Sequence, residues 1–338
     1  MFMPPEWAPH ARTWMAWPVR HYELSPEASH RAWSDVANTV VRYEPLTMLV
    51  DPGELASAKQ WLDPRVELVE QPLDDCWLRD NGPTFVLDGG RLAGIDWTFN
   101  GWGWAPHALD DQVAAAVLAR TGARAHRSAM VGEGGGIHVD GEGTVLVTET
   151  VQLDPRRNPG WTREQAEAEL KALLGVTKVI WLPRGLTADY VTFDEAGVQH
   201  GYGTNGHVDL LASFVRPGLV LCHVQPDPAH PDFEVTRENL AVLRAATDAR
   251  GRKLEVVEVL APTVLEAPGG GPVDYSYINH YLANGLVLTC SFDDPRDREA
   301  AELFARLFPG RAVESVDARD IFAQGGGIHC ITQQEPAL

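Results

Sequence analysis

The chain has 338 residues, of which 44% are hydrophobic and 22% are charged, so its composition is that of a folded protein rather than a disordered one. Its formal net charge of −19 argues against nucleic acid and anionic membranes as partners, because both bind clustered lysine and arginine side chains. The same charge can steer a small cationic ligand towards the protein, or can serve solubility alone.

Helix and strand patterns alternate through the first half of the chain. Ser25 followed by Pro26 is typical of a helix N-terminus. Thr162 with Gln165 matches a capping box at the start of a later helix. The predicted elements of this half are helices at 26–42, 110–120 and 163–175, and strands at 46–50, 84–87, 91–95, 144–149 and 176–182, the second and third of which form a hairpin.

The alternation continues through the second half and indicates an α/β fold. No stretch rich in glycine, serine or proline is long enough to separate two domains, so residues 1–338 are expected to form one catalytic domain. The predicted elements of this half are strands at 208–215, 219–224, 254–260, 275–282 and 286–292, and helices at 233–250 and 295–308.

A glycine-rich turn occurs twice. Glu133 precedes one copy, Gly134-Gly135-Gly136-Ile137-His138, whereas Cys330 follows the other, Gly325-Gly326-Gly327-Ile328-His329. Three consecutive glycines allow the backbone to bend or to approach a ligand closely. The two copies predict repeated modules that bring a carboxylate and a thiol to one place.

Cys330 is the strongest candidate for a nucleophile. A reactive thiol needs access and neighbours that favour the thiolate, and only Cys330 lies beside a glycine turn and a histidine. Cys222 and Cys290 lie in apolar strand patterns and are expected in the core, whereas Cys76 is expected to be partly exposed. The scattered cysteines form no disulfide pattern, so a reducing cytoplasm is the expected location. No apolar run approaches the roughly 20 residues that cross a bilayer, and no signal peptide is expected.

His207 and Asp209 are candidates for proton transfer and cation binding. Side chains two residues apart on a strand point to the same face, so these two are expected to project together. A histidine titrates near neutral pH, and a carboxylate beside it can orient the ring or hold a cation. The motif alone fits a solvated strand end equally well.

Trp77 and Asp80 form another candidate pair, directly before the predicted hairpin. Asp80 can bind a cation on which Trp77 stacks, or it can bond only to the backbone of its own Asp-Asn-Gly-Pro turn. Glu133 can orient a catalytic histidine from the edge of the first glycine turn. His138 and Asp140 can instead hold that turn together.

A metal site is the competing interpretation. His138-x-Asp140 and His207-x-Asp209 are two H-x-D patterns, and metal hydrolases use such clusters to activate water. Motifs of two residues are weak signals, however, and the common zinc, serine-hydrolase and P-loop motifs do not occur in the sequence.

Seven segments spread over essentially the whole chain form one set. They are PEWAPH (5–10), WMAWP (14–18), WLRDNGP (77–83), EGGGIHVDGEG (133–143), NGHVD (205–209), SYINHY (276–281) and GGGIHCITQQ (325–334). In this order they resemble the agmatine deiminase family, a member of the guanidino-group-modifying superfamily.

The resemblance implies a five-bladed α/β propeller, the pentein fold, built of repeated ββαβ modules around a central active site. It also implies hydrolysis of agmatine to N-carbamoylputrescine and ammonia, with neither a metal nor another cofactor. By match of motif, Cys330 would form a covalent thiouronium, His207 would be the general acid and base, and Glu133 would pair with His207. The substrate-binding residues would be Asp80, Asp209 and Trp77.

The chemistry of these residue types fits a small cationic guanidino substrate. Two carboxylates can accept its paired N–H donors and leave its central carbon open to a thiolate. Carboxylates near Cys330 should raise the pKa of the thiol, and we expect the bound cation to offset them.

The exact substrate stays open. The segment 101–104 (GWGW) and Leu210 depart from the family pattern, so loops that bind the far end of the substrate can differ. Free or peptidyl arginine is therefore an alternative substrate, and a metal-dependent ureohydrolase or amidohydrolase is a less favoured alternative enzyme. A homo-oligomer is also left open.

Overall fold

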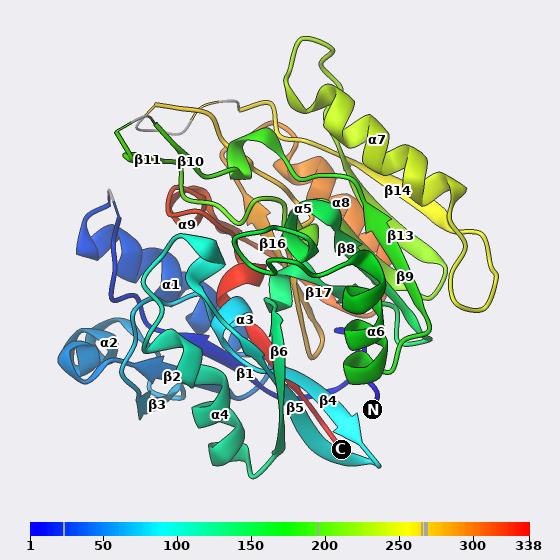
Figure 1. The fold of residues 1–338 in the computed structure, drawn as a ribbon. Helices are drawn as coiled ribbons and strands as arrows, with labels where there is room; N and C mark the ends of the chain where they lie inside the picture. Colours follow the sequence, from blue (N-terminus) through cyan, green and yellow to red (C-terminus); the bar gives the residue numbers. More distant parts are fainter. Residues whose placement is uncertain (23, 195, 265, 267–269) are drawn as a thin grey trace.

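The structure is a mixed α/β fold, as the alternation of elements predicted (Figure 1). This computed structural model describes residues 1–22, 24–194, 196–264, 266 and 270–338. Within these residues, five sheets have three or four strands each, and one further pair of short strands is present. None of the described helices is both long and apolar enough to cross a membrane.

The five larger sheets share one pairing pattern. The first strand of each sheet runs antiparallel to the second, and the second runs parallel to the third. One sheet joins the two ends of the chain, because its first strand is the last in the sequence (Figure 1). The sheets are β18 (Gln333–Pro336), β1 (His10–Ala16), β2 (Leu46–Val50) and β3 (Glu67–Glu70); β4 (Thr84–Asp88), β5 (Arg91–Thr98) and β6 (Arg124–Val131); β7 (His138–Val139), β8 (Thr144–Thr148) and β9 (Lys178–Leu182); β12 (Ala212–Arg216), β13 (Leu219–Val224) and β14 (Glu255–Leu260); β15 (Tyr281–Ala283), β16 (Leu286–Ser291) and β17 (Ala312–Asp317); and the short pair β10 (Thr192–Phe193) and β11 (Gln199–His200).

One longer helix joins the second strand of each large sheet to the third, because two parallel neighbours need a crossover connection. The repeating unit along the chain is therefore ββαβ. The crossover helices are α1 (Pro26–Val40), α4 (Val113–Thr121), α6 (Arg163–Leu174), α7 (Asp232–Ala245) and α8 (Asp297–Leu307), and the shorter helices are α2 (Leu55–Trp61), α3 (Leu78–Asn81), α5 (Glu149–Gln152) and α9 (Arg319–Phe322).

The helix ends predicted from capping residues are confirmed. Ser25 caps α1, and its hydroxyl accepts a hydrogen bond from the backbone N–H of Ala28. The Thr162 hydroxyl accepts from Gln165 N–H, while the Gln165 side chain accepts from Thr162 N–H, which completes the capping box of α6. Gly175 ends this helix with a φ of 71°, a left-handed conformation that favours glycine.

Interior strands of three sheets lie in the core. Every residue of β2, β8 and β13 is buried. A strand that is buried on both faces has no polar side to alternate with, so its sequence is a continuous apolar run. This explains why 46–50 and 219–224 were predicted as buried strands from composition alone.

Short helical turns lie directly before the first strands of four sheets. They are α3 before β4, η4 (Gly134–Gly136) before β7, η6 (Val208–Leu210) before β12, and η7 (His329–Ile331) before β18. α3 contacts both η4 and η7, and η4 also contacts η6. The repeated unit thus brings together turns that are far apart in the sequence.

The strand predicted at 208–215 begins later than expected. Residues 208–210 form η6, and β12 begins only at Ala212. The buried Asp189 carboxylate accepts hydrogen bonds from the backbone N–H groups of Thr204 and Gly206, and these bonds hold the preceding chain in a turn. The prediction that His207 and Asp209 share a strand face was therefore wrong.

The strand predicted at 275–282 is also shorter than expected, since β15 begins at Tyr281. The Ser276 hydroxyl donates to the backbone carbonyl of Leu210 and accepts from the backbone N–H of Ile278. Such local side-chain bonds compete with a strand ladder. The helix predicted at 233–250 ends at Ala245, and residues 247 and 253 beyond it form an antiparallel bridge.

Candidate active site

Cys330 lies at a small pocket that contains about 270 Å³ of empty space. The thiol comes from η7, directly after the second glycine turn. Five of the pocket's eleven lining residues are aromatic, and Asp80 contributes a carboxylate. The lining residues are Tyr22, Trp77, Asp80, Trp102, Trp104, Tyr202, Gly203, Thr204, Gln324, Gly325 and Cys330.

The Cys330 sulfur has both donors and carboxylates as neighbours. Asn279 Nδ2 donates to Sγ over 3.3 Å, and the backbone N–H of Gly327 donates over 3.4 Å. Asp209 Oδ2 lies 3.6 Å from Sγ. Burial, followed by the charges of Asp209 and Asp80, raises the pKa of the Cys330 thiol well above its usual range. The thiol is therefore protonated at neutral pH.

Gly135 marks the point where three functional side chains meet. A Cβ atom at this position would lie 2.5 Å from His207 Nδ1, and 3.0 Å from both Asp209 Oδ2 and Asp80 Oδ1. Real Cβ atoms do not approach other atoms so closely, so the middle residue of the first glycine turn must lack a side chain. The two carboxylates and the imidazole, which the sequence suggested separately, thus lie together.

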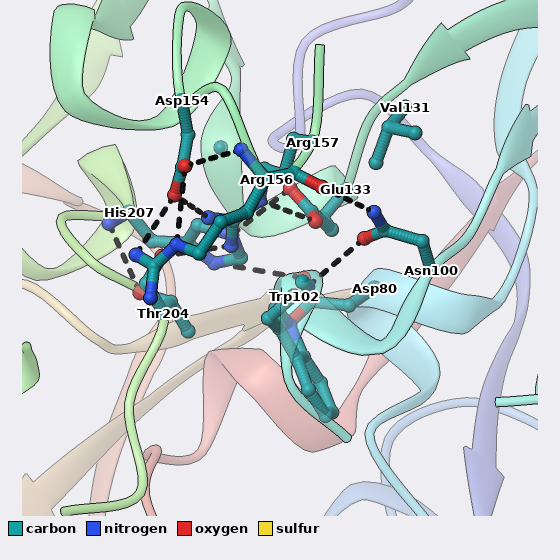
Figure 2. Close-up of polar contacts among 12 residues, drawn as sticks. Asp80, Asn100, Trp102, Val131, Glu133, Asp154, Arg156, Arg157, Thr204 and His207 are labelled. Atoms are coloured by element: carbon teal, nitrogen blue, oxygen red, sulfur yellow. Dashed lines mark hydrogen bonds and ion pairs between the residues drawn. The ribbon is translucent and has the colours of Figure 1, made fainter. Parts of the chain in front are cut away.

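The Asp80 carboxylate faces the pocket rather than its own turn. Oδ1 accepts a hydrogen bond from the backbone N–H of Gly135 over 3.0 Å. Oδ2 accepts one from Trp102 Nε1 over 3.0 Å (Figure 2). In the described residues, the alternative of an Asp-Asn-Gly-Pro turn closed by this carboxylate is therefore wrong. Burial raises the pKa of Asp80 to about 6, against the charge of His207 and with help from Asp209.

His207 lies between two carboxylates. Its Nε2 is 3.4 Å from Glu133 Oε2, and its Nδ1 is 3.7 Å from Asp80 Oδ1 (Figure 2). Arg157, which is fully buried, donates from Nε to Glu133 Oε1 over 2.8 Å and from Nη2 to the carbonyl of Thr204. We call Asp80, His207, Glu133 and Arg157 the His207 cluster.

Protonation in the His207 cluster follows from these pairings. Burial opposes every charge here, but Arg157 and His207 outweigh it and lower the pKa of Glu133 to about 2. Burial also opposes the charge of His207, yet Asp80 and Glu133 raise the pKa of this imidazole to about 9. At neutral pH the structure therefore places an imidazolium ion next to the pocket.

Trp77 packs beside the thiol, on the side of the second glycine turn. A Cβ atom at Gly326 would lie 2.6 Å from Trp77 Cζ3 and 3.1 Å from Cys330 Sγ. The indole is buried, packs edge-on against Trp33, and donates weakly from Nε1 to the Tyr22 hydroxyl over 3.4 Å. The middle glycine of each turn therefore makes room for a functional side chain.

The other cysteines and the first H-x-D pattern, His138-x-Asp140, have structural surroundings. Cys222 and Cys290 are buried in β13 and β16, as predicted, but Cys76 is also fully buried, so its predicted partial exposure was wrong. His138 Nδ1 accepts from the backbone N–H of Phe214, and Asp140 accepts from backbone N–H groups of its own turn. Among the described residues, no three potential ligands are arranged to hold a metal ion.

Three neighbours of the site were not predicted. Arg157 lies in a charged turn that is typical of a protein surface. Trp102 lies in the segment 101–104, which departs from the family pattern, and Asn279 lies inside the segment SYINHY (276–281). Trp102 has a φ of 55°, which is rare for a bulky residue and is typical of functional sites. No periodicity or spacing in the sequence marks these residues.

A mixed α/β fold in which a thiol, a histidine and two carboxylates converge on one pocket is typical of the enzymes that modify guanidinium groups. Over residues 2–336 the chain matches the family of Porphyromonas-type peptidyl-arginine deiminases, and it therefore belongs to that family.

The chain is also similar to several proteins known as agmatine deiminases. It is 59% identical to a Streptomyces avermitilis protein that provisionally carries this name, over 99% of this chain and 96% of that protein. It is 40% identical to the agmatine deiminase of Stutzerimonas stutzeri, over 99% and 95% of the two chains. The solved structure of an Enterococcus faecalis agmatine deiminase superposes with a TM-score of 0.92 at 32% identity, covering 99% of this chain and 95% of that one. The resemblance predicted from the seven segments is confirmed.

Proposed function

We propose that the protein hydrolyses agmatine to N-carbamoylputrescine and ammonia through a covalent thiouronium on Cys330. The observation that carries this proposal is the convergence of His207, Asp80 and Asp209 around Gly135, with Asp209 3.6 Å from the Cys330 sulfur. Two carboxylates beside a thiol fit a planar cation that must be held while its carbon is attacked. The names of the relatives support agmatine as the substrate.

Asp80 and Asp209 would bind the guanidinium by charge-assisted hydrogen bonds. Asp209 Oδ1 is buried and has no hydrogen-bond partner among the described residues, so it can accept a substrate N–H. The bound cation would offset the carboxylates that raise the pKa of the thiol, so that the Cys330 thiol releases its proton to solvent once substrate is present.

In the first chemical step, the Cys330 thiolate attacks the central guanidinium carbon and forms a carbon–sulfur bond. The His207 imidazolium then donates its proton to one terminal nitrogen, the carbon–nitrogen bond breaks, and ammonia leaves. The product of this step is a thiouronium on Cys330. The proton is available at neutral pH because the pKa of His207 is raised to about 9.

In the second step, neutral His207 accepts a proton from water as the water oxygen attacks the thiouronium carbon. The carbon–sulfur bond breaks and the thiolate is restored. The hydroxyl proton of the adduct passes to solvent, and N-carbamoylputrescine is released. Glu133 would hold the imidazole in place through both steps, and Arg157 would hold Glu133 (Figure 2). No metal or other cofactor has a role in this scheme.

The pocket wall favours agmatine over free arginine. Its lining residues include five aromatic side chains and no lysine or arginine that could pair with an α-carboxylate. An alkyl chain that ends in an amine can instead lie along tryptophan and tyrosine rings, because a cation is attracted to a ring face.

We further propose that residues 1–338 form one catalytic domain, a five-bladed propeller in which each ββαβ unit is one blade. The support is the common pairing pattern of the five large sheets in the described part of the chain, together with the sheet that joins both chain ends. The four cysteines are all unpaired, which favours a reducing cytoplasm as the location of the enzyme.

The proposal is tested by measuring ammonia release from agmatine, free arginine and a peptidyl-arginine substrate, with wild-type protein and with Cys330→Ala, each with and without EDTA. We expect release from agmatine by wild type, no effect of EDTA, and none from Cys330→Ala. Faster release from arginine substrates would reassign the substrate. Loss of activity with EDTA and retention in Cys330→Ala would favour a metal-dependent hydrolase instead.

A further inference from the structure

A second buried cluster of charged side chains lies behind the candidate active site. His329 Nδ1 is 2.7 Å from Asp209 Oδ2, and His329 Nε2 is 2.9 Å from Glu6 Oε2. Arg79 adds a cation, since its Nη2 lies 4.0 Å from Glu6 Oε2 and its Nε donates to the carbonyl of His329 over 3.2 Å. We call Asp209, His329, Glu6 and Arg79 the His329 cluster, and all four side chains are buried.

The two short contacts of His329 determine its protonation state. A neutral imidazole has one N–H donor and one bare nitrogen, and a bare nitrogen repels a carboxylate oxygen. Both ring nitrogens of His329 face carboxylates within hydrogen-bonding distance, so both bonds form only if the ring is an imidazolium ion.

The charges of the cluster lead to the same conclusion. Arg79 carries one positive charge, and Glu6 and Asp209 carry one negative charge each. A buried group of charges is costly unless it is balanced, and this one is balanced only when His329 is also positive. Burial and Arg79 oppose the proton, but Glu6 and Asp209 outweigh them and raise the pKa of His329.

We propose that His329, as a permanent imidazolium between Glu6 and Asp209, is a positioning residue that fixes the substrate-binding carboxylate and offsets its charge beside the Cys330 thiol. The ring occupies Oδ2 of Asp209 and leaves Oδ1, which has no partner in the described residues, for the guanidinium. This role rests on the proposed function, because it concerns the same thiol and the same substrate.

His329 differs from two neighbouring histidines, His138 and His280. At neutral pH His329 carries a proton on both ring nitrogens, whereas the other two rings are neutral. Burial lowers the pKa of His138 to about 3 and that of His280 to about 4, so both rings are neutral there. The pKa values of Glu6 and Asp209 are lowered despite burial, chiefly by His329. The titratable and charged groups around His329 are Glu6, Arg79, His138, Asp209, His280 and Cys330.

The first test measures alkylation of Cys330 by iodoacetamide against pH, read by mass spectrometry of the Cys330 peptide. It compares wild type with His329→Asn, which keeps a donor for Asp209 but has no charge, and with Glu6→Gln. We expect the apparent pKa of the thiol to rise by roughly one unit in His329→Asn, because a neighbouring cation is removed. The kcat/KM for agmatine should fall about tenfold or more at neutral pH, with a change in its pH profile.

The matched control is His138→Asn, a change of the same kind in the first glycine turn. His138 is buried like His329, but its ring is neutral and its Nδ1 only accepts a backbone N–H, which an asparagine oxygen can also do. The alkylation profile of this variant should match wild type. An equal shift in both variants would show a general packing effect and would overturn the proposal.

The second test uses only the wild-type protein, so it does not depend on whether a variant folds. Nitrogen-15 NMR of histidine-labelled wild type, with the ring signals of His329 assigned through bonds to its backbone, should show protons on both ring nitrogens at pH 8. A bare nitrogen at that pH would overturn the proposal. The alkylation profile and the NMR spectrum do not depend on turnover, so a failure of the His329 assignment is distinct from a failure of agmatine hydrolysis.

Discussion

The His207 cluster and the His329 cluster contain the same kinds of groups in the same order. Each has a histidine between two carboxylates, and in each an arginine lies beside the outer carboxylate. The distances differ between the two clusters. His207 lies 3.4 and 3.7 Å from its carboxylates, whereas His329 lies 2.9 and 2.7 Å from its own.

This difference separates a proton carrier from a fixed charge. Long contacts leave His207 free to give up a proton and take it back, and its ring meets Asp80 at the pocket. Short contacts on both sides hold the proton of His329 in place. The same residue types can therefore serve catalysis or positioning, depending on how tightly they are held.

Replacing His207 should have the largest effect on turnover. His207→Asn keeps a polar side chain of similar reach but has no titratable group, so kcat should fall by about 10²–10⁴-fold. Steady-state kinetics with agmatine, beside His329→Asn, measures this effect. A larger kcat loss in His329→Asn than in His207→Asn would reverse the roles given to the two clusters.

Adding one carbon at Gly135 should also break the His207 cluster. In Gly135→Ala the new Cβ would lie 2.5 Å from His207 Nδ1, so the ring or the turn must shift. A displacement of this size at reacting groups should lower kcat/KM about one-hundredfold. Gly136→Ala is the control, since its Cβ would meet no atom closer than 3.3 Å. Equal losses in the two variants would contradict the account.

The two arginines should differ in their contribution to stability. Arg157→Met leaves Glu133 buried without its 2.8 Å partner, which should lower the free energy of unfolding by about 3–5 kcal/mol. Arg79→Met removes a 4.0 Å contact to Glu6 and hydrogen bonds to two neutral acceptors, the His329 carbonyl and Gln334 Oε1. It should cost less, because Glu6 keeps its closer partner His329. Urea unfolding of both variants measures the difference. The reverse order would mean that the His329 cluster depends more on its arginine.

The pH dependence of kcat/KM should report the ionisation of Asp80 and of His207. If Asp80 binds the guanidinium when ionised, as proposed, kcat/KM should fall below about pH 6, where this carboxyl becomes protonated. His207 acts as an acid when protonated, so kcat/KM should fall above about pH 9. Trp102→Phe removes a donor to Asp80 and should move the acid limb to higher pH. An unchanged acid limb in that variant would assign the limb to another group.

Local sequence signals were sufficient for much of the fold. The hairpin of β4 and β5 and the capping box of α6 depend on neighbours within a few residues, and both are present as predicted. The strand starts near 208 and 275 were wrong because side chains such as Asp189 and Ser276 bond to the backbone of these segments. Such bonds join residues that no periodicity relates.

In the candidate site, too, residues that the local sequence marks were predicted, and residues that act through distant contacts were not. Trp77, Asp80 and Cys330 line one pocket. His207 and Asp209 meet Asp80 around Gly135. Glycine turns and paired polar residues mark such places in a sequence. Arg157 and Glu6 carry no such mark. Glu6 meets His329 from the opposite end of the chain, so only folding shows what it does.

The central claim is that the Cys330 sulfur becomes bonded to the guanidinium carbon of agmatine during turnover. Mass spectrometry of acid-quenched reactions tests it most directly. We predict a peptide in which Cys330 carries the thiouronium derived from agmatine. The control variant Cys330→Ser, which lacks the sulfur, should not show this adduct. Repeated failure to find this adduct, together with full activity of Cys330→Ser, would contradict the account.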